Sequence, residues 1–123
     1  MRIILIDDDE DFCDIFCWKV KKYVDVIDCV LDTSSGLKML QDAKYDLLAI
    51  DVNLPEVKGY DFIKEIKKMG LLPPRVIMLS GIVIDEEKEI AMNFGVDEYL
   101  EKDFNFNFLT NILDMANEKR VYR

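Results

Sequence analysis

Short apolar runs alternate along this chain with longer amphipathic stretches. One run covers residues 47–50 and ends directly at Asp51, and Val52-Asn53-Leu54-Pro55 follows. A continuous apolar run of this length is typical of a strand buried on both faces of a parallel sheet. Such a strand delivers its last residue to the carboxyl edge of the sheet, where open α/β sheets bind ligands. The pattern therefore predicts that Asp51 lies at a functional edge.

The same alternation repeats as five strand–helix units. Strands are predicted over residues 3–6, 26–31, 47–51, 76–79 and 98–102. Helices are predicted after the acidic run at residues 7–11 and over residues 33–40, 60–69, 85–94 and 106–118. Right-handed crossovers between successive strands give a parallel sheet with helices on both faces. The fifth strand is more polar than the others, so we expect it near an edge of this doubly wound α/β sheet.

The helices also carry local signals. The hydroxyls at residues 33–35 are expected to cap the second helix, and Gly70 and Gly95 to end the third and fourth. Helical spacing predicts one face of the first helix from Phe12, Ile15, Phe16, Lys19, Val20 and Tyr23.

The composition fits one globular domain over residues 1–123. Half of the 123 residues are hydrophobic and a third are charged, which allows a real core and is unlike a disordered chain. A net charge of −9 argues against direct nucleic-acid binding, since phosphate backbones are bound by an excess of Lys and Arg. The apolar start is four residues long and ends in acids, so we expect no signal peptide and no membrane span.

Three cysteines, Cys13, Cys17 and Cys29, have no metal-like pairing. Cys13 and Cys17 share a helix face, but the chain has no His and no second Cys pair to complete a zinc site. We therefore expect buried free thiols in a reducing cytoplasm.

Candidate chemistry gathers at the ends of four predicted strands. The first strand delivers Asp7 and Asp8, the central strand Asp51, the fourth Ser80 and the fifth Lys102. Three carboxylates close together raise one another's pKa unless a cation lies among them. Hard oxygen ligands without His or thiolate select Mg²⁺, or its mimic Mn²⁺.

This set of residues suits phosphoryl transfer. Asp51 is the best nucleophile, because a carboxylate can form an acyl phosphate. Asp8 would bind the metal directly and Asp7 through water. Lys102 and the Ser80 hydroxyl would hold the phosphoryl oxygens.

Two small groups complete the predicted phosphate space. Gly81 leaves room for the phosphate and offers a backbone N–H. Asn53, two residues after Asp51, lines the same space and could orient a water for dephosphorylation.

At these residues the chain resembles the receiver family of response regulators in two-component signalling. The similarity covers nearly the whole chain: Asp7-Asp8 ends an apolar strand, Leu54-Pro55 and Gly59 follow Asp51, Ser80-Gly81 ends the fourth strand, and Tyr99 stands three before Lys102. Each motif alone is weak, and the ordered set is specific. The resemblance implies a flavodoxin-like, CheY-like fold with five helices and the strand order 2-1-3-4-5.

The resemblance also implies a function and its partners. A sensor histidine kinase or phosphotransfer protein would pass a phosphoryl group to Asp51, with Mg²⁺ bound by Asp8, Asp51 and the backbone carbonyl of Asn53. Ser80 and Tyr99 would form a switch pair that changes the face built from the fourth helix, fifth strand and fifth helix. A protein target would read that face in the cytoplasm. No effector domain is expected within these 123 residues, so the output would lie in another protein or in the rest of a longer regulator. The domain would act as a phospho-acceptor with slow self-dephosphorylation, not as a turnover enzyme.

One position departs from the family pattern. Family members usually carry Pro after the Lys, often with a cis bond, whereas here Asp103 follows Lys102. A cis bond to a residue other than proline costs about 3 kcal/mol, so we expect a trans bond. Asp103 also adds a negative charge near the phosphate.

Other functions stay open at this stage. Asp7-Asp8-Asp9 contains the Asp-x-Asp spacing of dehalogenase-like phosphatases with an aspartate nucleophile. A receiver-shaped interaction module that is never phosphorylated is another alternative, favoured only by Asp103. A flavin module is discounted, because the acids at residues 7–11 would repel the flavin phosphate.

Two structural alternatives are also open. Tyr99 fits a partly buried strand aromatic as well as a moving switch. Phe104, Phe106 and Phe108 either tuck under the sheet edge or face a partner.

Overall fold

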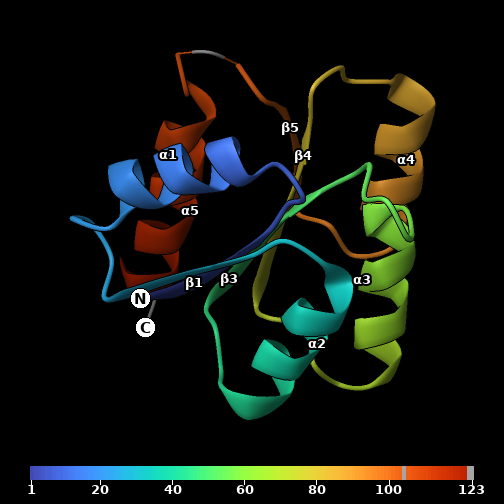
Figure 1. Cartoon of the computed structure of the whole chain (residues 1–123), viewed down its shortest axis with the longest axis horizontal. Coiled ribbons are helices and arrows are strands. Elements are labelled where there is room, and N and C mark those ends of the chain that lie inside the picture. The colour runs from blue at the N-terminus through green and yellow to red at the C-terminus, as the bar shows by residue number, and fades with distance from the viewer. Residues whose placement is uncertain (104, 122–123) are drawn as a thin grey trace.

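A five-stranded parallel sheet with the order β2-β1-β3-β4-β5 forms the centre of the molecule (Figure 1). The computed structural model describes the backbone of residues 1–103 and 105–121, and the side chains of residues 1–103 and 105–114. The strands are β1 (Arg2–Ile6), β2 (Val26–Val30), β3 (Leu47–Asp51), β4 (Arg75–Ser80) and β5 (Glu98–Glu101). The helices are α1 (Glu10–Val20), α2 (Thr33–Asp42), α3 (Gly59–Lys68), α4 (Asp85–Asn93) and α5 (Phe108–Val121). The predicted doubly wound α/β fold and its strand order are confirmed, with β5 at an edge.

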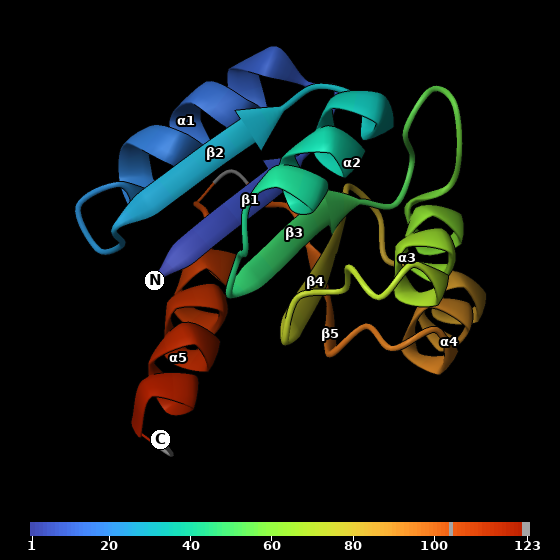
Figure 2. The same ribbon diagram turned by 90° about the horizontal axis from the view of Figure 1, so that it is seen from below.

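Two layers of helices cover the sheet. Helices α1 and α5 lie on one face, and α2, α3 and α4 lie on the other (Figures 1 and 2). Successive residues of β1 therefore enter different cores: Ile3 and Leu5 pack with α1 and α5, whereas Ile4 and Ile6 pack with α2 and α3. Because both faces are covered, the inner strands need apolar side chains at every position. This is the physical origin of the continuous apolar run that ends at Asp51.

The first helices begin at acidic caps. The side chain of Asp9 accepts a hydrogen bond from the Phe12 N–H at 3.1 Å and begins α1. Asp32 accepts from the Ser35 N–H at 2.7 Å and begins α2. The predicted hydroxyl cap of α2 is therefore wrong. The Thr33 N–H and hydroxyl instead donate to Glu56, because Asp32 already has the extended backbone of a cap residue.

The inward face of α1 is narrower than its pattern predicts. Phe16 and Val20 are buried together with Cys13, whereas Ile15 is 44% exposed and Tyr23 is 58% exposed. A helix that lies on a flat sheet buries a stripe of positions three and four apart. Ile15 falls beside that stripe, and Tyr23 lies beyond the end of α1.

The cysteines differ from the expectation of three free thiols. Cys17 and Cys29 form a disulfide, and Cys13 is free and buried. Cys17 lies on α1 and Cys29 on the neighbouring edge strand β2. Their separation of 12 residues gives no hint in the sequence that the helix and the strand bring the two sulfurs together.

The helix ends agree with the glycine signals. Gly70 follows α3 with φ +72°, and Gly95 follows α4 with φ +99°. Both values lie in the left-handed region that favours glycine. No helix among residues 1–103 and 105–121 combines the length and apolar character required to cross a bilayer.

Gly59 lies against the backbone of Asp51. A Cβ atom built on Gly59 would lie 2.4 Å from the carbonyl oxygen of Asp51. This oxygen belongs to the end of the central strand, so it cannot move without disturbing the carboxyl edge. A Cβ atom on Gly81, by contrast, would meet no heavy atom within 4 Å among the described residues.

We expect Gly59→Ala to lower the free energy of unfolding by about 1–3 kcal/mol, because the added methyl group forces the β3 end and the start of α3 apart. Gly81→Ala is the matched control and should change stability by less than about 0.5 kcal/mol. Urea unfolding of both variants measures the difference. Equal stability of the two variants would contradict the close approach at Gly59.

Candidate functional site

Hydrogen bonds between neighbouring strands extend past the strand ends and hold the carboxyl edge in register. The Asp7 N–H donates to the Val30 carbonyl at 3.1 Å, and the Lys102 N–H donates to the Ser80 carbonyl at 2.8 Å. Asp51 is itself paired in register with Leu79 of β4. The sheet therefore brings Asp7, Asp51 and Lys102 to one edge, as the sequence predicts.

Three carboxylates meet at this edge. One oxygen from each of Asp7, Asp8 and Asp51 lies within 4.8 Å of the other two. Asp7 is fully buried, Asp51 is 8% exposed, and Asp8 is exposed. The cluster therefore runs from the interior to the surface, and its outer side is open to solvent.

The ammonium group of Lys102 joins the two buried acids. Its Nζ lies 2.5 Å from Asp7 Oδ2 and 3.2 Å from Asp51 Oδ2. The other oxygens face backbone amides: Asp7 Oδ1 accepts from the Asp9 N–H at 3.0 Å, and Asp51 Oδ1 accepts from the Asn53 N–H at 3.3 Å. In each of the two acids, one carboxylate oxygen accepts a hydrogen bond from a backbone N–H and the other contacts the Lys102 ammonium group. These contacts hold both side chains in place.

Burial and ion pairing act against each other on these groups. Burial raises the pKa of Asp7 and of Asp51, although Lys102 acts to lower both values. Burial alone would lower the pKa of Lys102, but the hydrogen bonds and charges of Asp7 and Asp51 outweigh it and raise that pKa. Desolvation, and then the charge of Asp7, raises the pKa of Cys13 to about 12. Lys102 is therefore charged, whereas its ammonium group offsets only part of the cost of burying the two carboxylates.

The charge of the cluster fits a divalent cation. Three carboxylates and one ammonium group leave two negative charges, and Mg²⁺ would balance both. The donors are hard oxygens, with neither His nor thiolate among the three clustered residues, which suits Mg²⁺ or Mn²⁺. Asp8 is exposed and Asp51 is 8% exposed, whereas Asp7 is fully buried. Asp8 and Asp51 are therefore the two residues that could hold such an ion from the solvent side.

Ser80 and Tyr99 lie beside this cluster on β4 and β5. The Ser80 hydroxyl donates to the Ile82 carbonyl at 2.6 Å and accepts from the Ile82 N–H at 3.3 Å. The Tyr99 ring is buried in the core shared with Ala91 of α4. Its hydroxyl makes no direct hydrogen bond to the described side chains and backbone groups. Burial raises the Tyr99 pKa, and the neighbouring Ser80 hydroxyl acts to lower it.

A line of polar contacts leads from Asp51 to α4. The Asn53 N–H binds Asp51, and the Asn53 side-chain oxygen accepts from the Lys58 ammonium at 2.5 Å. Lys58 Nζ also lies 3.3 Å from Glu87 Oε2 in the first turn of α4. Asn53 is thus tied to the neighbouring helix, a connection that the sequence does not reveal.

The chain matches one family model along most of its length. Residues 3–114 match the response regulator receiver domain. The chain belongs to this family. It is therefore a response regulator receiver domain of the kind used in two-component systems, as its motifs predict.

Curated relatives of this receiver domain are longer regulatory proteins. The uncharacterized transcriptional regulatory protein YcbL of Bacillus subtilis is 31% identical over 107 residues, which are 87% of this chain and 46% of YcbL. The transcriptional regulatory protein CiaR of Streptococcus pneumoniae is 31% identical over 104 residues, covering 85% of this chain and 46% of CiaR. The chain thus spans about half the length of the curated relatives it matches.

Solved structures share the fold of the receiver domain. A two-component response regulator from Clostridium difficile superposes with a TM-score of 0.87 at 22% identity and covers 98% of both chains. The response regulator TrrA from Thermotoga maritima, solved in complex with Mg²⁺–BeF, has a TM-score of 0.79 at 24% identity, covering 93% of this chain and 96% of TrrA.

Asp103, the departure from the family pattern, turns away from the cluster. Its side chain accepts from the Asn107 N–H at 3.0 Å, and its carbonyl accepts from the Phe106 N–H at 3.2 Å. The Lys102–Asp103 bond is trans, as expected, and residues 1–103 and 105–121 contain no cis peptide bond. Asp103 therefore organises the approach to α5 within this receiver domain.

Aromatic rings cover one side of Lys102, which motif spacing alone did not predict. Phe12 lies under the Lys102 ammonium, 4.5 Å from ring centre to Nζ. Phe106 and Phe108 stack on Phe12 at 5.5 and 5.9 Å between ring centres. These two rings are thus tucked in, whereas Phe104 lies outside the described residues.

We expect Asp51→Asn to stabilise the metal-free protein near neutral pH and to raise its Tm. The pKa of Asp51 is raised on folding, so the folded protein binds more protons between the ordinary pKa and the raised one. The free energy of unfolding therefore falls as pH rises through that range. The uncharged side chain introduced by Asp51→Asn does not titrate, so the variant does not lose this stability. Thermal unfolding in EDTA between pH 4 and pH 8 measures it.

Asp42→Asn is the matched control, because Asp42 is exposed at the end of α2. It should leave the pH dependence of Tm unchanged. If the metal-free Asp51→Asn protein is less stable than the parent at pH 8, the buried charge of Asp51 does not destabilise the fold and the prediction is wrong.

We expect Tyr99→Phe to leave stability unchanged or to raise it slightly, because the buried hydroxyl makes no direct hydrogen bond that would offset its desolvation. Tyr45 is an equally buried control, 5% exposed like Tyr99, but its hydroxyl donates to Asp28. Tyr45→Phe should therefore cost about 1–3 kcal/mol. Urea unfolding compares the two variants, and a larger loss for Tyr99→Phe would refute the difference.

Proposed function

We propose that this receiver domain accepts a phosphoryl group on Asp51 and responds by changing the face formed by α4, β5 and α5. The observation that carries the proposal is the meeting of Asp7, Asp8 and Asp51 at one edge, with the Lys102 ammonium 3.2 Å from Asp51. Such an edge can accept a transferred phosphoryl group and offset its charge.

Accessibility favours Asp51 as the acceptor over its two acidic neighbours. Asp7 is fully buried, and its Oδ2 lies against Lys102. Asp8 is exposed and has no resolved contact with the ammonium group. Asp51 alone combines a Lys102 contact with an opening to solvent, so a phosphoryl donor can reach it while its charge is offset.

The transfer is a displacement at phosphorus. An oxygen of Asp51 forms a bond to phosphorus while the bond from phosphorus to a histidine nitrogen of the donor breaks, and the imidazole keeps the electron pair. The product is an acyl phosphate on Asp51. The donor is a phosphohistidine of a sensor histidine kinase or a phosphotransfer protein.

The surrounding residues stabilise the charge on the phosphoryl oxygens. Lys102 binds one oxygen through its ammonium group, and Gly81 leaves room and offers its N–H. Asp8, Asp51 and the Asn53 carbonyl would hold Mg²⁺, and Asp7 would act on the ion through water. When bound, the ion supplies positive charge for the phosphoryl oxygens.

Ser80 and Tyr99 connect the phosphate to α4. The Ser80 hydroxyl exchanges its bond with the Ile82 carbonyl for one with the phosphate. This vacates space that the Tyr99 ring fills by turning inward, and the ring packs in the core shared with Ala91 of α4. The Asn53–Lys58–Glu87 contacts offer a second route, so that a protein partner reads the state of Asp51 on the α4-β5-α5 face.

Asp51 is phosphorylated once and then loses the group slowly, so the domain acts as a switch and not as a turnover enzyme. The domain works in the cytoplasm, contacts proteins and does not itself bind nucleic acid. Because Asp9 caps α1, the Asp-x-Asp arrangement of an aspartate phosphatase is the weaker alternative.

Intact-mass measurement after incubation with Mg²⁺ and phosphoramidate tests the proposal. We expect one phosphoryl adduct on the parent protein and none on Asp51→Asn, because the amide oxygen is a poor nucleophile. Lys102→Met should slow formation of the adduct by about 10²-fold or more.

Asp42→Asn, which removes an exposed carboxylate at the opposite edge, should form the adduct as the parent does. Absence of any adduct on the parent would favour an interaction module that is never phosphorylated. Steady release of phosphate from p-nitrophenyl phosphate would favour the phosphatase.

A further inference from the structure

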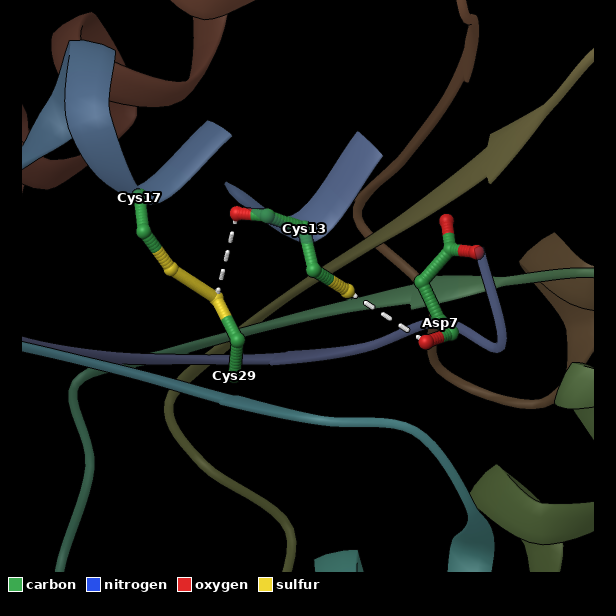
Figure 3. Close-up of a disulfide and its surroundings, with 4 residues drawn as sticks. All are labelled: Asp7, Cys13, Cys17 and Cys29. Carbon is green, nitrogen blue, oxygen red and sulfur yellow. Dashed lines mark hydrogen bonds between the residues drawn. A yellow bond between two sulfur atoms is a disulfide. The ribbon is translucent and has the colours of Figure 1, made fainter. Parts of the chain in front are cut away.

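The disulfide between Cys17 and Cys29 joins α1 to the edge strand β2 (Figure 3). Both cysteines are half-buried, so a small thiol can reach them from the surface. Cys13, one helical turn earlier, is only 3% exposed. The three cysteines therefore divide into an accessible pair and one protected thiol.

We propose that Cys17 and Cys29 are a reversible redox site, which exchanges with low-molecular-weight disulfides and in its disulfide form fixes α1 to β2 as far as the Asp7–Asp9 turn. Nothing in the phosphoryl chemistry of Asp51 requires these two sulfurs. The proposal therefore stands independently of the proposed function.

The exchange is balanced. The thiolate of one cysteine attacks a disulfide such as oxidised glutathione, forms a mixed disulfide and releases one glutathione thiol. The second cysteine, as its thiolate, then attacks the protein sulfur of the mixed disulfide and releases the other glutathione thiol. Two electrons pass from the protein to the glutathione disulfide, and the two protons of the cysteine thiols end on the released glutathione. A small dithiol reverses both steps.

The charge near Cys17 suits an anionic exchange partner. Lys19, Lys21 and Lys22 follow Cys17 at the end of α1, in a chain whose net charge is −9. Lys21 lies one turn after Cys17, and its N–H donates to the Cys17 carbonyl at 3.0 Å. Glutathione carries carboxylates, so these lysines favour its approach to the end of α1, while Asp14 and Asp28 beside the two cysteines act against it.

Both redox forms find suitable contacts in the same fold. The Cys29 sulfur lies 3.7 Å from the Cys13 carbonyl oxygen. In the dithiol form the Cys29 S–H can donate a weak hydrogen bond to that oxygen, whereas the disulfide sulfur has no proton to donate. Opening the bond therefore leaves no buried group without a partner at Cys29.

Cys13 carries the constraint from the disulfide to the acidic edge. Its carbonyl faces Cys29, and its thiol donates to the Asp7 carbonyl at 3.3 Å (Figure 3). Asp7 in turn accepts from the Asp9 N–H, and Asp9 caps α1. A bond that fixes α1 at Cys17 therefore limits how far this turn can move.

Peptide mapping by mass spectrometry tests the pairing. After oxidised glutathione, the parent should lose two hydrogen atoms, with Cys17 linked to Cys29 and Cys13 free. A dithiol should restore all three thiols. Labelling of Cys17 and Cys29 after oxidation, or a bond that no dithiol reopens in the folded protein, would overturn the proposal.

Three variants separate the pair from the protected thiol. Cys17→Ser and Cys29→Ser should each stop at one glutathione adduct on the remaining partner, because the second attack is lost. Cys13→Ala should still form the Cys17–Cys29 bond. Capture of Cys13 in a disulfide in any of these proteins would contradict the assignment.

The effect on α1 is read from stability and hydrogen exchange. The disulfide form should unfold on the order of 10 °C higher than the dithiol form, because the bond closes a loop in the unfolded chain. Amides of residues 9–20 should exchange more slowly in the disulfide form, and those of α3 should not change. Equal exchange of the α1 amides in both forms would overturn the fixing of α1.

Discussion

The ion pairs of Lys102 with Asp7 and Asp51 are the interaction on which the carboxyl edge depends. Two carboxylates at the ends of adjacent strands lose most of their hydration, and one ammonium group between them offsets only part of the cost. Removing the lysine would leave two buried acids facing each other, which proteins tolerate only by protonating one of them. The site is therefore assembled by folding but left short of positive charge, which is a suitable starting state for binding a metal ion and a phosphoryl group.

Parallel pairing is what allows one lysine to reach both acids. β1 and β3 are adjacent, so Asp7 and Asp51 follow neighbouring strand ends, while Lys102 follows the edge strand β5. The helices on both faces exclude solvent from these strands and hold them in register. The backbone of Gly59 closes against Asp51 with no space for a side chain, so the loop that leaves the central strand is held as firmly as the strand itself.

The apolar run before Asp51 was sufficient to predict the strand and the edge at which it ends, because burial on both faces of the sheet makes such a strand continuously apolar. Features that depend on contacts between different helices and strands could not be recognised in the composition. Cys17 and Cys29 pair because α1 packs on β2, and the Asp103 side chain accepts a hydrogen bond from the Asn107 N–H at the approach to α5. The cap at Asp32 was missed because neighbouring hydroxyls offered the same chemistry, and only the backbone angles distinguish them.

The contacts of Lys58 have a consequence for the behaviour of the domain in different surroundings. Its ion pair with Glu87 lies at the surface, with the Lys58 side chain 44% exposed, and dissolved ions weaken such a pair. The Tyr99 ring packs in the core against α4 and is insensitive to ionic strength. The two connections between the Asp51 edge and α4 therefore differ in kind. The Lys58–Glu87 ion pair weakens as the salt concentration rises, whereas the packing of the Tyr99 ring does not change.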